Sequence, residues 1–387
     1  MGKAVKQMNT QLLRQYIDEH LETYVDFLCQ ICAFEARAKD KDTIDRMLDY
    51  ITEFASGLGF QITRTPMETC GDFLTIDMNA GAEKGCVFLA HTDTVHEKGV
   101  FGPNPVTRLE DRIIAPGVID CKGGIAIALL TMKALKDHGY PKHLRLLLTS
   151  DEEVGNILGG QKELDFFAER CAGFPCALNC ETTEQDRVAI SRSGILRYTM
   201  EIHGVSGHSG SRYFQCKNAI EEAAHKILAL HGASQPGGIT YSCNIIQGGS
   251  VANIIPESCT LTIDVRFRRH DDLDTAESFV NQVAQTSFLG GTTATVTRIS
   301  KRPPMEKNPQ TMALFEQLLD VCRRYDLGSL TPVESGGGSD SCYTQLAGIP
   351  SICALGACGE FCHTTREYAL ISSLSLRAKI LALFLAG

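Results

Sequence analysis

The sequence predicts an α/β domain that is interrupted by an inserted α+β module. Over 1–192, and again over 305–387, short apolar runs bounded by polar residues alternate with helical patterns, as in α/β proteins. Between them, 193–304 carries four mainly alternating strand patterns and two helical patterns, which are typical of an antiparallel sheet covered by helices. We therefore predict a discontinuous first domain, 1–192 with 305–387, and an inserted domain at 193–304.

Composition narrows the class of protein. The chain has 387 residues, 43% hydrophobic and 21% charged, which suits a globular protein of two or three domains. The net charge of -9, with no basic run, argues against nucleic acid or an anionic membrane as a partner. No signal peptide is evident near Lys3 and Lys6, and the apolar run 380–386 is too short to cross a bilayer. The 16 scattered cysteines are expected to be reduced and mostly buried, in a cytoplasmic protein.

The first domain begins with helical patterns and continues with strands. Asn9 can cap a helix whose apolar positions run over 12–28, and Asp42 or Thr43 begins a second helix over 44–58. A helix is also expected at 125–135 and a hairpin turn at 109–111. The strand patterns of this part lie at 60–65, 73–78, 86–90, 144–148 and 176–180.

The inserted domain and the return to the first domain follow the same kinds of pattern. The predicted strands lie at 195–203, 240–247, 258–267 and 293–299, and the predicted helices at 219–230 and 273–286. Residues 301–304 are predicted to be the linker back. The remaining elements are a helix at 310–322, a loop at 334–340, a strand at 349–353 and a final helix.

Three buried strand patterns each lead into a residue that can bind a metal. The strands that end near residues 90, 148 and 180 are followed by His91, Glu153 and Glu181. In open α/β sheets, ligand sites collect beyond the carboxyl ends of the strands. The sequence therefore predicts a metal site at this edge of the sheet.

The candidate ligands are two imidazoles and three carboxylates, which are donors that zinc accepts. They are His91, Asp120, Glu153, Glu181 and His363. Five ligands are too many for one tetrahedral ion, but they suit two ions that share a bridging carboxylate. Two such ions, about 4 Å apart, can hold a water as hydroxide and polarise the carbonyl that it attacks.

Two further carboxylates fit supporting roles. Asp93 lies two residues after His91, so both side chains share a face in extended backbone and Asp93 can orient the imidazole. Glu152 precedes Glu153 and is not needed as a ligand. It can take a proton from the attacking water and pass it to the leaving nitrogen.

The motifs fall in the order of one known family. They are H-T-D-T-V from His91, G-V-I-D-C-K-G-G from Gly117, D-E-E-V-G from Asp151, G-V-S-G-H-S-G from Gly204, N-I-I-P-E-S-C-T-L-T-I-D-V-R from Asn253 and G-G-G-S-D from Gly336. With Glu181 and His363, this pattern resembles the co-catalytic zinc metallopeptidase family of carboxypeptidase G, aminoacylase, succinyl-diaminopimelate desuccinylase and peptidase T. The likeness covers nearly the whole chain and is greatest to the carboxypeptidase G type, a glutamate carboxypeptidase.

The resemblance implies a zinc-exopeptidase-like catalytic domain, with a mixed sheet flanked by helices and an inserted lid that forms a homodimer. It implies two Zn²⁺ ions, for which Co²⁺ or Mn²⁺ can substitute. Asp120 would bridge the ions, His91 and Glu181 would complete one site, and Glu153 and His363 the other. Asp93 would orient the zinc histidine, and Glu152 would be the general acid/base. The family often has a cis peptide bond after the bridging aspartate, here before Cys121.

The resemblance also assigns residues of the lid and its surroundings. His208 would reach into the partner's site and stabilise the oxyanion, and Asn253 and Arg266 would contact substrate. Arg302 would meet the substrate carboxylate, and Gly337 and Gly338 would approach the substrate closely. Each has a plainer alternative, as an exposed turn, a surface charge or a solvated linker residue. Three other arginines could also meet a substrate carboxylate: Arg192, Arg197 and Arg212.

The predicted function is hydrolysis of a peptide or amide bond beside a free carboxylate, by an exopeptidase of the glutamate carboxypeptidase type. An N-acyl-amino-acid deacylase, similar to aminoacylase or the desuccinylase, would use the same chemistry on another acyl group. A more remote alternative is a metal-binding homologue without turnover. The substrate would be a small peptide or an N-acyl amino acid.

Three cysteines adjoin predicted ligands: Cys121, Cys180 and Cys362. Neighbouring side chains point to opposite faces of extended backbone, so these thiols are predicted to pack the core behind the site. The alternative is that one of them makes the site sensitive to oxidation or captures a softer metal.

Overall fold

The computed structural model describes residues 8–387, which form two compact units. The first unit contains the described residues up to Ser191 together with Lys307–Glu334 and Ser339–Gly387. The second unit contains Arg192–Glu306 and also the short segment Ser335–Gly338. Among the described residues, no helix combines the length and the apolar character that crossing a membrane requires.

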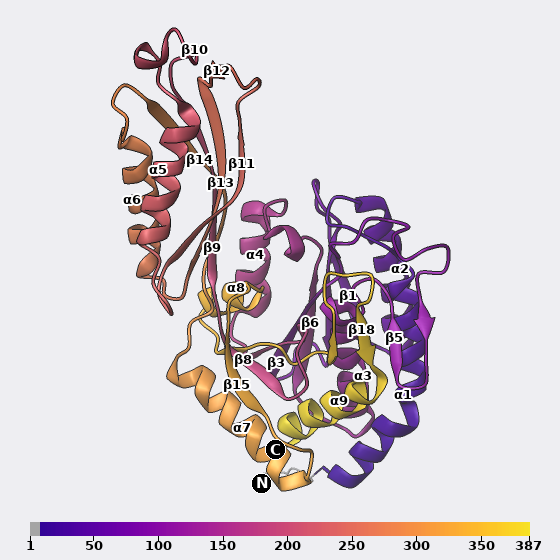
Figure 1. Ribbon diagram of the computed structural model, residues 1–387. Coiled ribbons are helices and arrows are strands. Elements are labelled where there is room, and N and C mark those ends of the chain that lie inside the picture. Colours follow the sequence, from indigo (N-terminus) through magenta and orange to yellow (C-terminus); the bar gives the residue numbers. More distant parts are fainter. Residues whose placement is uncertain (1–7) are drawn as a thin grey trace. The chain divides into compact units, whose positions relative to one another are not determined.

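A six-stranded mixed sheet forms the centre of the first unit (Figure 1). Its order is β1 (Gln61–Thr65), β2 (Phe73–Met78), β6 (His143–Thr149), β3 (Lys84–His91), β7 (Ala177–Asn179) and β16 (Ser351–Ile352). The strand β3 runs parallel to β6 on one side and to β7 on the other, whereas β1 and β2 are antiparallel to their neighbours. The carboxyl ends of β6, β3 and β7 therefore meet at one edge, as predicted.

Helices flank this sheet. The helices α1 (Thr10–Cys32), α3 (Gly123–Asp137) and α9 (Ile371–Ala386) pack against one another, and α7 (Pro309–Tyr325) packs against α9. The helix α3 also contacts β3 and β6. The others are α2 (Lys41–Gly57), which contacts β1, and α4 (Gly160–Cys171), which contacts α8 (Ser341–Leu346). Nearly every residue of α3 is buried because it lies against both the sheet and other helices.

The helix ends test two sequence predictions. Asn9 caps α1 as predicted, because its Oδ1 accepts the N–H groups of Gln11 and Leu12 at 3.1 Å each. The predicted start of α2 at Asp42 or Thr43 is wrong. Asp40 is the cap, and its Oδ1 accepts the N–H of Thr43 at 3.2 Å.

Short strands complete the first unit. The order β17 (Gly359–Glu360), β18 (Tyr368–Leu370), β5 (Arg112–Ile114) and β4 (Thr107–Arg108) forms a small sheet, with the predicted turn 109–111 between β4 and β5. A further pair joins β8 (Arg187–Arg192) to β15 (Thr331–Ser335). The strands β8 and β15 and the helix α4 were not predicted from the sequence.

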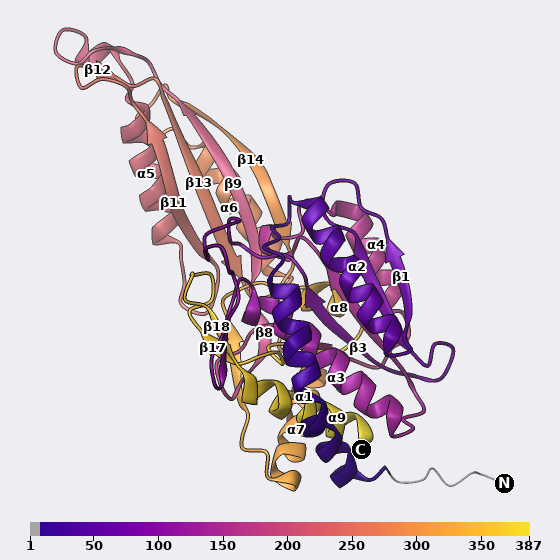
Figure 2. The ribbon, with the colours of Figure 1, turned by 90° about the vertical axis from the view of Figure 1, so that its right-hand side faces the viewer.

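The second unit is an antiparallel sheet with two helices on one face (Figure 2). The strand order is β11 (Thr240–Gly248), β13 (Ser258–Phe267), β9 (Gly194–His203) and β14 (Thr293–Arg302), and the helices are α5 (Ala219–Gly232) and α6 (Asp272–Gln285). Alternate residues of β13 are buried, as its sequence pattern predicts. The pair β10 (Gly207–His208) and β12 (Ile254–Ile255) lies outside this sheet.

The predicted linker 301–304 is wrong in its first half. Lys301 and Arg302 belong to β14, where Arg302 pairs with Ile195 of β9. Two prolines follow at 303 and 304 and end the strand, because proline has no N–H to donate to a ladder.

Candidate metal centre

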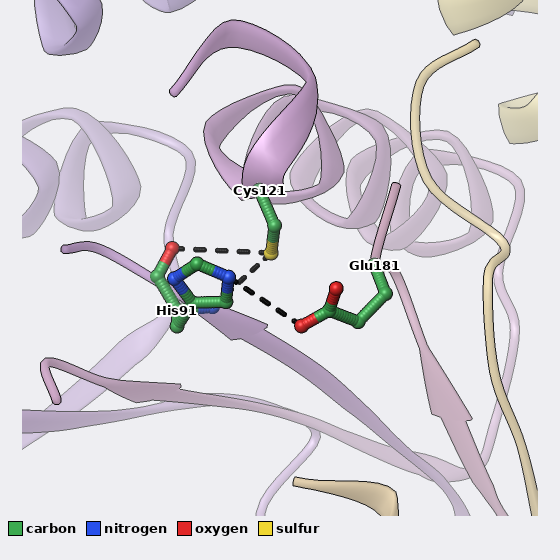
Figure 3. A group of neighbouring side chains, drawn as sticks. All are labelled: His91, Cys121 and Glu181. Carbon is green, nitrogen blue, oxygen red and sulfur yellow. Dashed lines mark hydrogen bonds and ion pairs between the residues drawn. The ribbon is translucent and has the colours of Figure 1, made fainter. Parts of the chain in front are cut away.

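The parallel strands bring the predicted ligands of the first unit together. His91 is the last residue of β3, and Glu181 follows β7. Glu153 belongs to a short helical turn, Glu152–Val154, that follows β6. Figure 3 shows the side chains of Glu181 and Cys121 pointing toward His91.

Asp120 lies between the two predicted metal histidines. Its Oδ1 is 3.0 Å from Nε2 of His91, and its Oδ2 is 3.2 Å from Nε2 of His363. Nε2 of His91 is also 3.4 Å from Oε1 of Glu181, and Nε2 of His363 is 3.4 Å from Oε2 of Glu153. All five predicted ligands therefore meet in one place, and each oxygen of Asp120 faces a different imidazole.

The donors fit two divalent cations. Glu153 Oε1 is buried and has no hydrogen-bond partner among the described residues, as expected of an oxygen that awaits a ligand. Three carboxylates this close repel one another unless positive charge lies between them. Zinc accepts both imidazole nitrogen and carboxylate oxygen. The five residues form two groups that share Asp120, one with His91 and Glu181 and the other with Glu153 and His363.

The pKa shifts show the same need for positive charge. Burial, with the nearby charge of Asp120, raises the pKa of Glu153 to about 7. Burial would raise the pKa of Asp120 as well, but hydrogen bonds from His363 and His91 hold it well below its usual value. Burial would lower the pKa of His91, but Cys121, Asp120 and Asp93 raise it well above its usual value.

Asp93 connects the imidazole to the turn after β6. Its Oδ1 is 3.2 Å from Nδ1 of His91, the nitrogen that faces away from Asp120. The same carboxylate accepts the N–H of Glu152 at 3.3 Å and that of Glu153 at 3.0 Å. It therefore orients one predicted ligand and also positions the turn that carries Glu152, which is 9% exposed.

Sequence reasoning missed a second supporting carboxylate, Glu367. It is fully buried; its Oε1 accepts the N–H of Ile119 at 3.0 Å, and its Oε2 is 2.9 Å from Nε2 of His96. It thereby connects the loop after β3 to the residue before Asp120. Its place four residues after His363 was the only signal in the sequence.

The segment around Asp120 is not extended. The peptide bond between Asp120 and Cys121 is cis, as the family resemblance implies. Gly117, which begins this turn, has φ 68°, in the left-handed region that favours glycine. Lys122, fully buried, donates to the carbonyl oxygens of Phe34 at 2.8 Å and Pro116 at 3.3 Å.

The prediction that the three cysteines pack the core behind the site is confirmed for Cys121 and Cys180, which are buried in the core, and is wrong for Cys362, which is only partly buried. Cys121 Sγ accepts the N–H of His91 at 3.2 Å, and Cys362 Sγ is 3.1 Å from Oδ2 of Asp120. Strict alternation does not apply because Cys121 has φ -131° and ψ 32° and His363 has φ 63°, so neither segment is extended. Cys180 packs in the core, as predicted.

In the second unit, His208 and Asn253 lie close together. His208 pairs with Ile254 across β10 and β12, and the N–H of Ser209 donates to the carbonyl of Asn253 at 3.0 Å. Nδ1 of His208 accepts the N–H groups of Gly210 and Ser211, at 3.1 and 3.3 Å. Because these bonds occupy Nδ1, Nε2 is the ring nitrogen that can bind another group.

Three arginines of the second unit surround the glycine loop 336–338. Arg266 donates to the carbonyl of Gly336 at 3.3 Å and also forms an ion pair with Asp264. Arg192 is 3.5 Å from the carbonyl oxygen of Gly338. A Cβ on Gly338 would lie 3.0 Å from Cδ of Arg302, so the glycine lets the Arg302 side chain pack closely against the loop. Arg266 and Arg302, which were predicted to bind substrate, therefore both lie against the loop. Arg192, one of the three other arginines considered for a substrate carboxylate, lies there as well.

The fold and the site define a class of protein, the hydrolases that use metal ions to cleave peptide or amide bonds. The model of peptidase family M20/M25/M40 matches residues 87–387. Because this match covers well over half of the sequence, the chain belongs to that family, and it is a metal-dependent peptidase or amidohydrolase.

Individual proteins support this membership. Carboxypeptidase G2 of Pseudomonas sp. (strain RS-16) is 27% identical over 384 residues, covering 97% of this chain and 92% of the relative. Succinyl-diaminopimelate desuccinylase of Sulfurovum sp. (strain NBC37-1) is 25% identical, covering 90% of this chain and 95% of the relative.

Solved structures share the fold. A tripeptidase from Staphylococcus aureus superposes with a TM-score of 0.79 at 22% identity, covering 98% of this chain and 99% of the other. The YXEP protein of Bacillus subtilis, described as a dinuclear metal binding peptidase, gives a TM-score of 0.70 at 14% identity, covering 95% and 98%.

The contacts of Asp93 generate a prediction. In Asp93→Asn, the imidazole of His91 loses a charged partner at Nδ1. We expect metal affinity to fall by about 10–100-fold, the usual effect of removing such a partner. Isothermal titration of metal-free protein would measure it. The control is Asp111→Asn, because the Asp111 carboxylate also accepts a backbone N–H, that of Ser372 in α9, but is not a partner of a predicted ligand. Equal affinities of Asp93→Asn and wild type would contradict the role of Asp93.

Proposed function

We propose that this protein is a dinuclear zinc exopeptidase of the glutamate carboxypeptidase type, which hydrolyses a peptide or amide bond beside a free carboxylate. One observation carries the proposal. The two oxygens of Asp120 face two different imidazoles, and each imidazole has a further carboxylate near it. This is the arrangement that two ions with a shared carboxylate require.

His91, Asp120 and Glu181 would hold one zinc ion, and Asp120, Glu153 and His363 the other. When bound, the ions supply Lewis-acid polarisation of the substrate carbonyl and lower the pKa of water. Zinc is proposed because it accepts the mixed set of imidazole and carboxylate donors, and Co²⁺ or Mn²⁺ could take its place.

Glu152 would act as the general acid/base. It adjoins Glu153 in the same turn, and the N–H groups of both residues bind Asp93, so its position relative to the ligands is determined by the backbone. Its carboxylate would take the proton of the attacking water and deliver it to the leaving nitrogen.

The glycine loop 336–338 supports recognition of a carboxylate. Arg192, Arg266 and Arg302 all lie against it, and guanidinium groups bind carboxylates through paired hydrogen bonds. Main-chain atoms of Gly337 and Gly338 would lie close to the substrate there. The resemblance of the sequence motifs to the carboxypeptidase G type, a glutamate carboxypeptidase, favours glutamate as the terminal residue.

We further propose a homodimer through the second unit, in which His208 serves the partner's site together with Asn253. Its Nδ1 accepts two backbone N–H groups, so Nε2 carries the proton and can donate to a developing oxyanion. A cytoplasmic location is proposed because all 16 cysteines are free thiols, as is usual in a reducing compartment.

The second candidate function is an N-acyl-amino-acid deacylase, which the likeness to succinyl-diaminopimelate desuccinylase favours. It would use the same ligands and the same general acid/base. A metal-binding homologue without turnover is the remote alternative, and the presence of Glu152 and Asp93 beside the ligands speaks against it.

A substrate panel separates these functions. Zinc-loaded protein would be given dipeptides that end in Glu, Asp, Ala or Lys, and N-acetyl and N-benzoyl amino acids, with metal counted on the same sample. We expect two zinc ions per chain and turnover mainly on acidic C-termini, because arginines surround the glycine loop. Preference for simple N-acyl compounds would establish the deacylase, and full metal with no turnover would support the remote alternative.

The role of Glu152 predicts a separation of metal binding from chemistry. Glu152→Gln should retain both metal ions and lose about 10²–10⁴-fold in kcat, because the amide cannot accept the proton. Steady-state kinetics and metal analysis on the same preparation measure both. Glu110→Gln, in an exposed turn, is the control. Wild-type kcat in the Glu152 variant would refute the assignment.

The proposed dimer predicts complementation. His208→Ala and Glu152→Gln proteins are each expected to be nearly inactive. Unfolding and refolding an equal mixture should restore about one quarter of wild-type activity, because half of the dimers are mixed and one of their two sites is complete. Size-exclusion chromatography would verify the dimers. If mixed dimers form without any gain, His208 does not act on the partner's site.

A further inference from the structure

Cys362 places a sulfur atom beside the carboxylate that would bridge the metals. Its Sγ is 3.1 Å from Oδ2 of Asp120, and Nε2 of the next residue, His363, is 3.2 Å from the same oxygen. Adjacent residues can converge in this way because His363 adopts φ 63°, which turns the chain out of extended geometry.

These atoms form a group with the dimensions of a metal site. Ligand atoms of Asp120, Cys362 and His363 all lie within 4.8 Å of one another. Glu153 adds a fourth donor, since its Oε2 is 3.4 Å from Nε2 of His363. The other oxygen of Glu153 is buried and has no hydrogen-bond partner among the described residues, which points independently to a missing ligand.

We propose that Cys362 is a sulfur ligand of the metal ion held by Asp120, Glu153 and His363. This inference rests on the two-metal centre proposed above. On binding, the S–H bond breaks, its proton passes to solvent, and a sulfur–metal bond replaces the contact with Asp120; nothing is oxidised or reduced. The resulting set of two oxygens, one nitrogen and one sulfur is acceptable to zinc, and the attacking water would be a fifth donor, a coordination number that catalytic zinc can reach.

A sulfur ligand changes which metals the site prefers. Thiolate favours zinc and other thiophilic ions, whereas carboxylate and water donors suit Mn²⁺ and Mg²⁺. The metal position that contains Cys362 and His363 should therefore bind Co²⁺ and Zn²⁺ in strong preference to Mn²⁺. The other metal position, which contains His91 and Glu181, would lack this preference.

Cys121 is the internal comparison. Its sulfur accepts the backbone N–H of His91 at 3.2 Å and lies 3.9 Å from the carbonyl oxygen of the same residue. It is therefore held against the main chain of β3, although it is near Glu181 (Figure 3). Cys29, half-buried on α1, is a matched control outside the cluster.

The experiment is titration of metal-free protein with Co²⁺, followed by near-ultraviolet absorption. We expect two cobalt ions per chain and a sulfur-to-cobalt charge-transfer band in the wild type. The band should disappear in Cys362→Ser and persist in Cys121→Ser and Cys29→Ser. The second cobalt ion should bind more than about tenfold more weakly in Cys362→Ser, and the preference for Co²⁺ over Mn²⁺ should narrow by a similar factor.

Each outcome decides the matter. Two bound cobalt ions without a charge-transfer band, or a band that persists in Cys362→Ser, would overturn the sulfur ligand and leave the two-metal centre intact. Loss of the band in Cys121→Ser alone would assign the ligand to the other thiol and refute this proposal. Failure of the wild type to bind cobalt would refute the two-metal centre itself, and the inference with it. Cys362→Ala, compared by circular dichroism, separates loss of the ligand from loss of the fold.

Discussion

The contact on which the site depends is that of the Asp120 carboxylate with the two imidazoles on either side of it. His91 comes from the end of a buried strand, whereas His363 comes from a segment more than two hundred residues later in the chain. One carboxylate can face both only if its own backbone is held firmly. Glu367 provides part of that support through the N–H of Ile119, and Lys122 provides more by binding carbonyl oxygens on two segments.

The supporting carboxylates share one design. Asp93 and Glu367 are fully buried, and each binds one histidine and at least one backbone N–H. A buried carboxylate with such partners holds a loop against its neighbour and leaves the loop little conformational freedom. The donor atoms of the site are therefore held in place by supporting residues, Asp93 and Glu367, which come from different segments of the chain. This explains why the catalytic chemistry can reside on loops without losing its geometry.

The two units carry different parts of the proposed reaction. The first holds the imidazoles, the carboxylates and Glu152. The second holds His208, Asn253 and the arginines around the glycine loop 336–338. That loop belongs to the second unit although its neighbours in sequence belong to the first. Groups proposed to recognise a substrate are thus separated along the chain from groups proposed to activate water, an arrangement in which specificity could change without disturbing the metal ligands.

The sequence alone predicted the α/β domain with its inserted α+β module, the five candidate ligands and the candidate general acid/base Glu152. Buried parallel strands read as continuous apolar runs, and their carboxyl ends must meet at one edge, so His91, Glu153 and Glu181 could be identified before any coordinates. The resemblance to the family added the bridging role of Asp120, the mixed sheet and the cis bond, of which the structure shows the sheet and the bond. The tertiary structure alone decided the direction of Cys121 and Cys362, the role of Glu367 and the gathering of Arg192 with Arg266 and Arg302. These depend on backbone that is neither helix nor strand, or on pairing between distant segments, and no local periodicity encodes either.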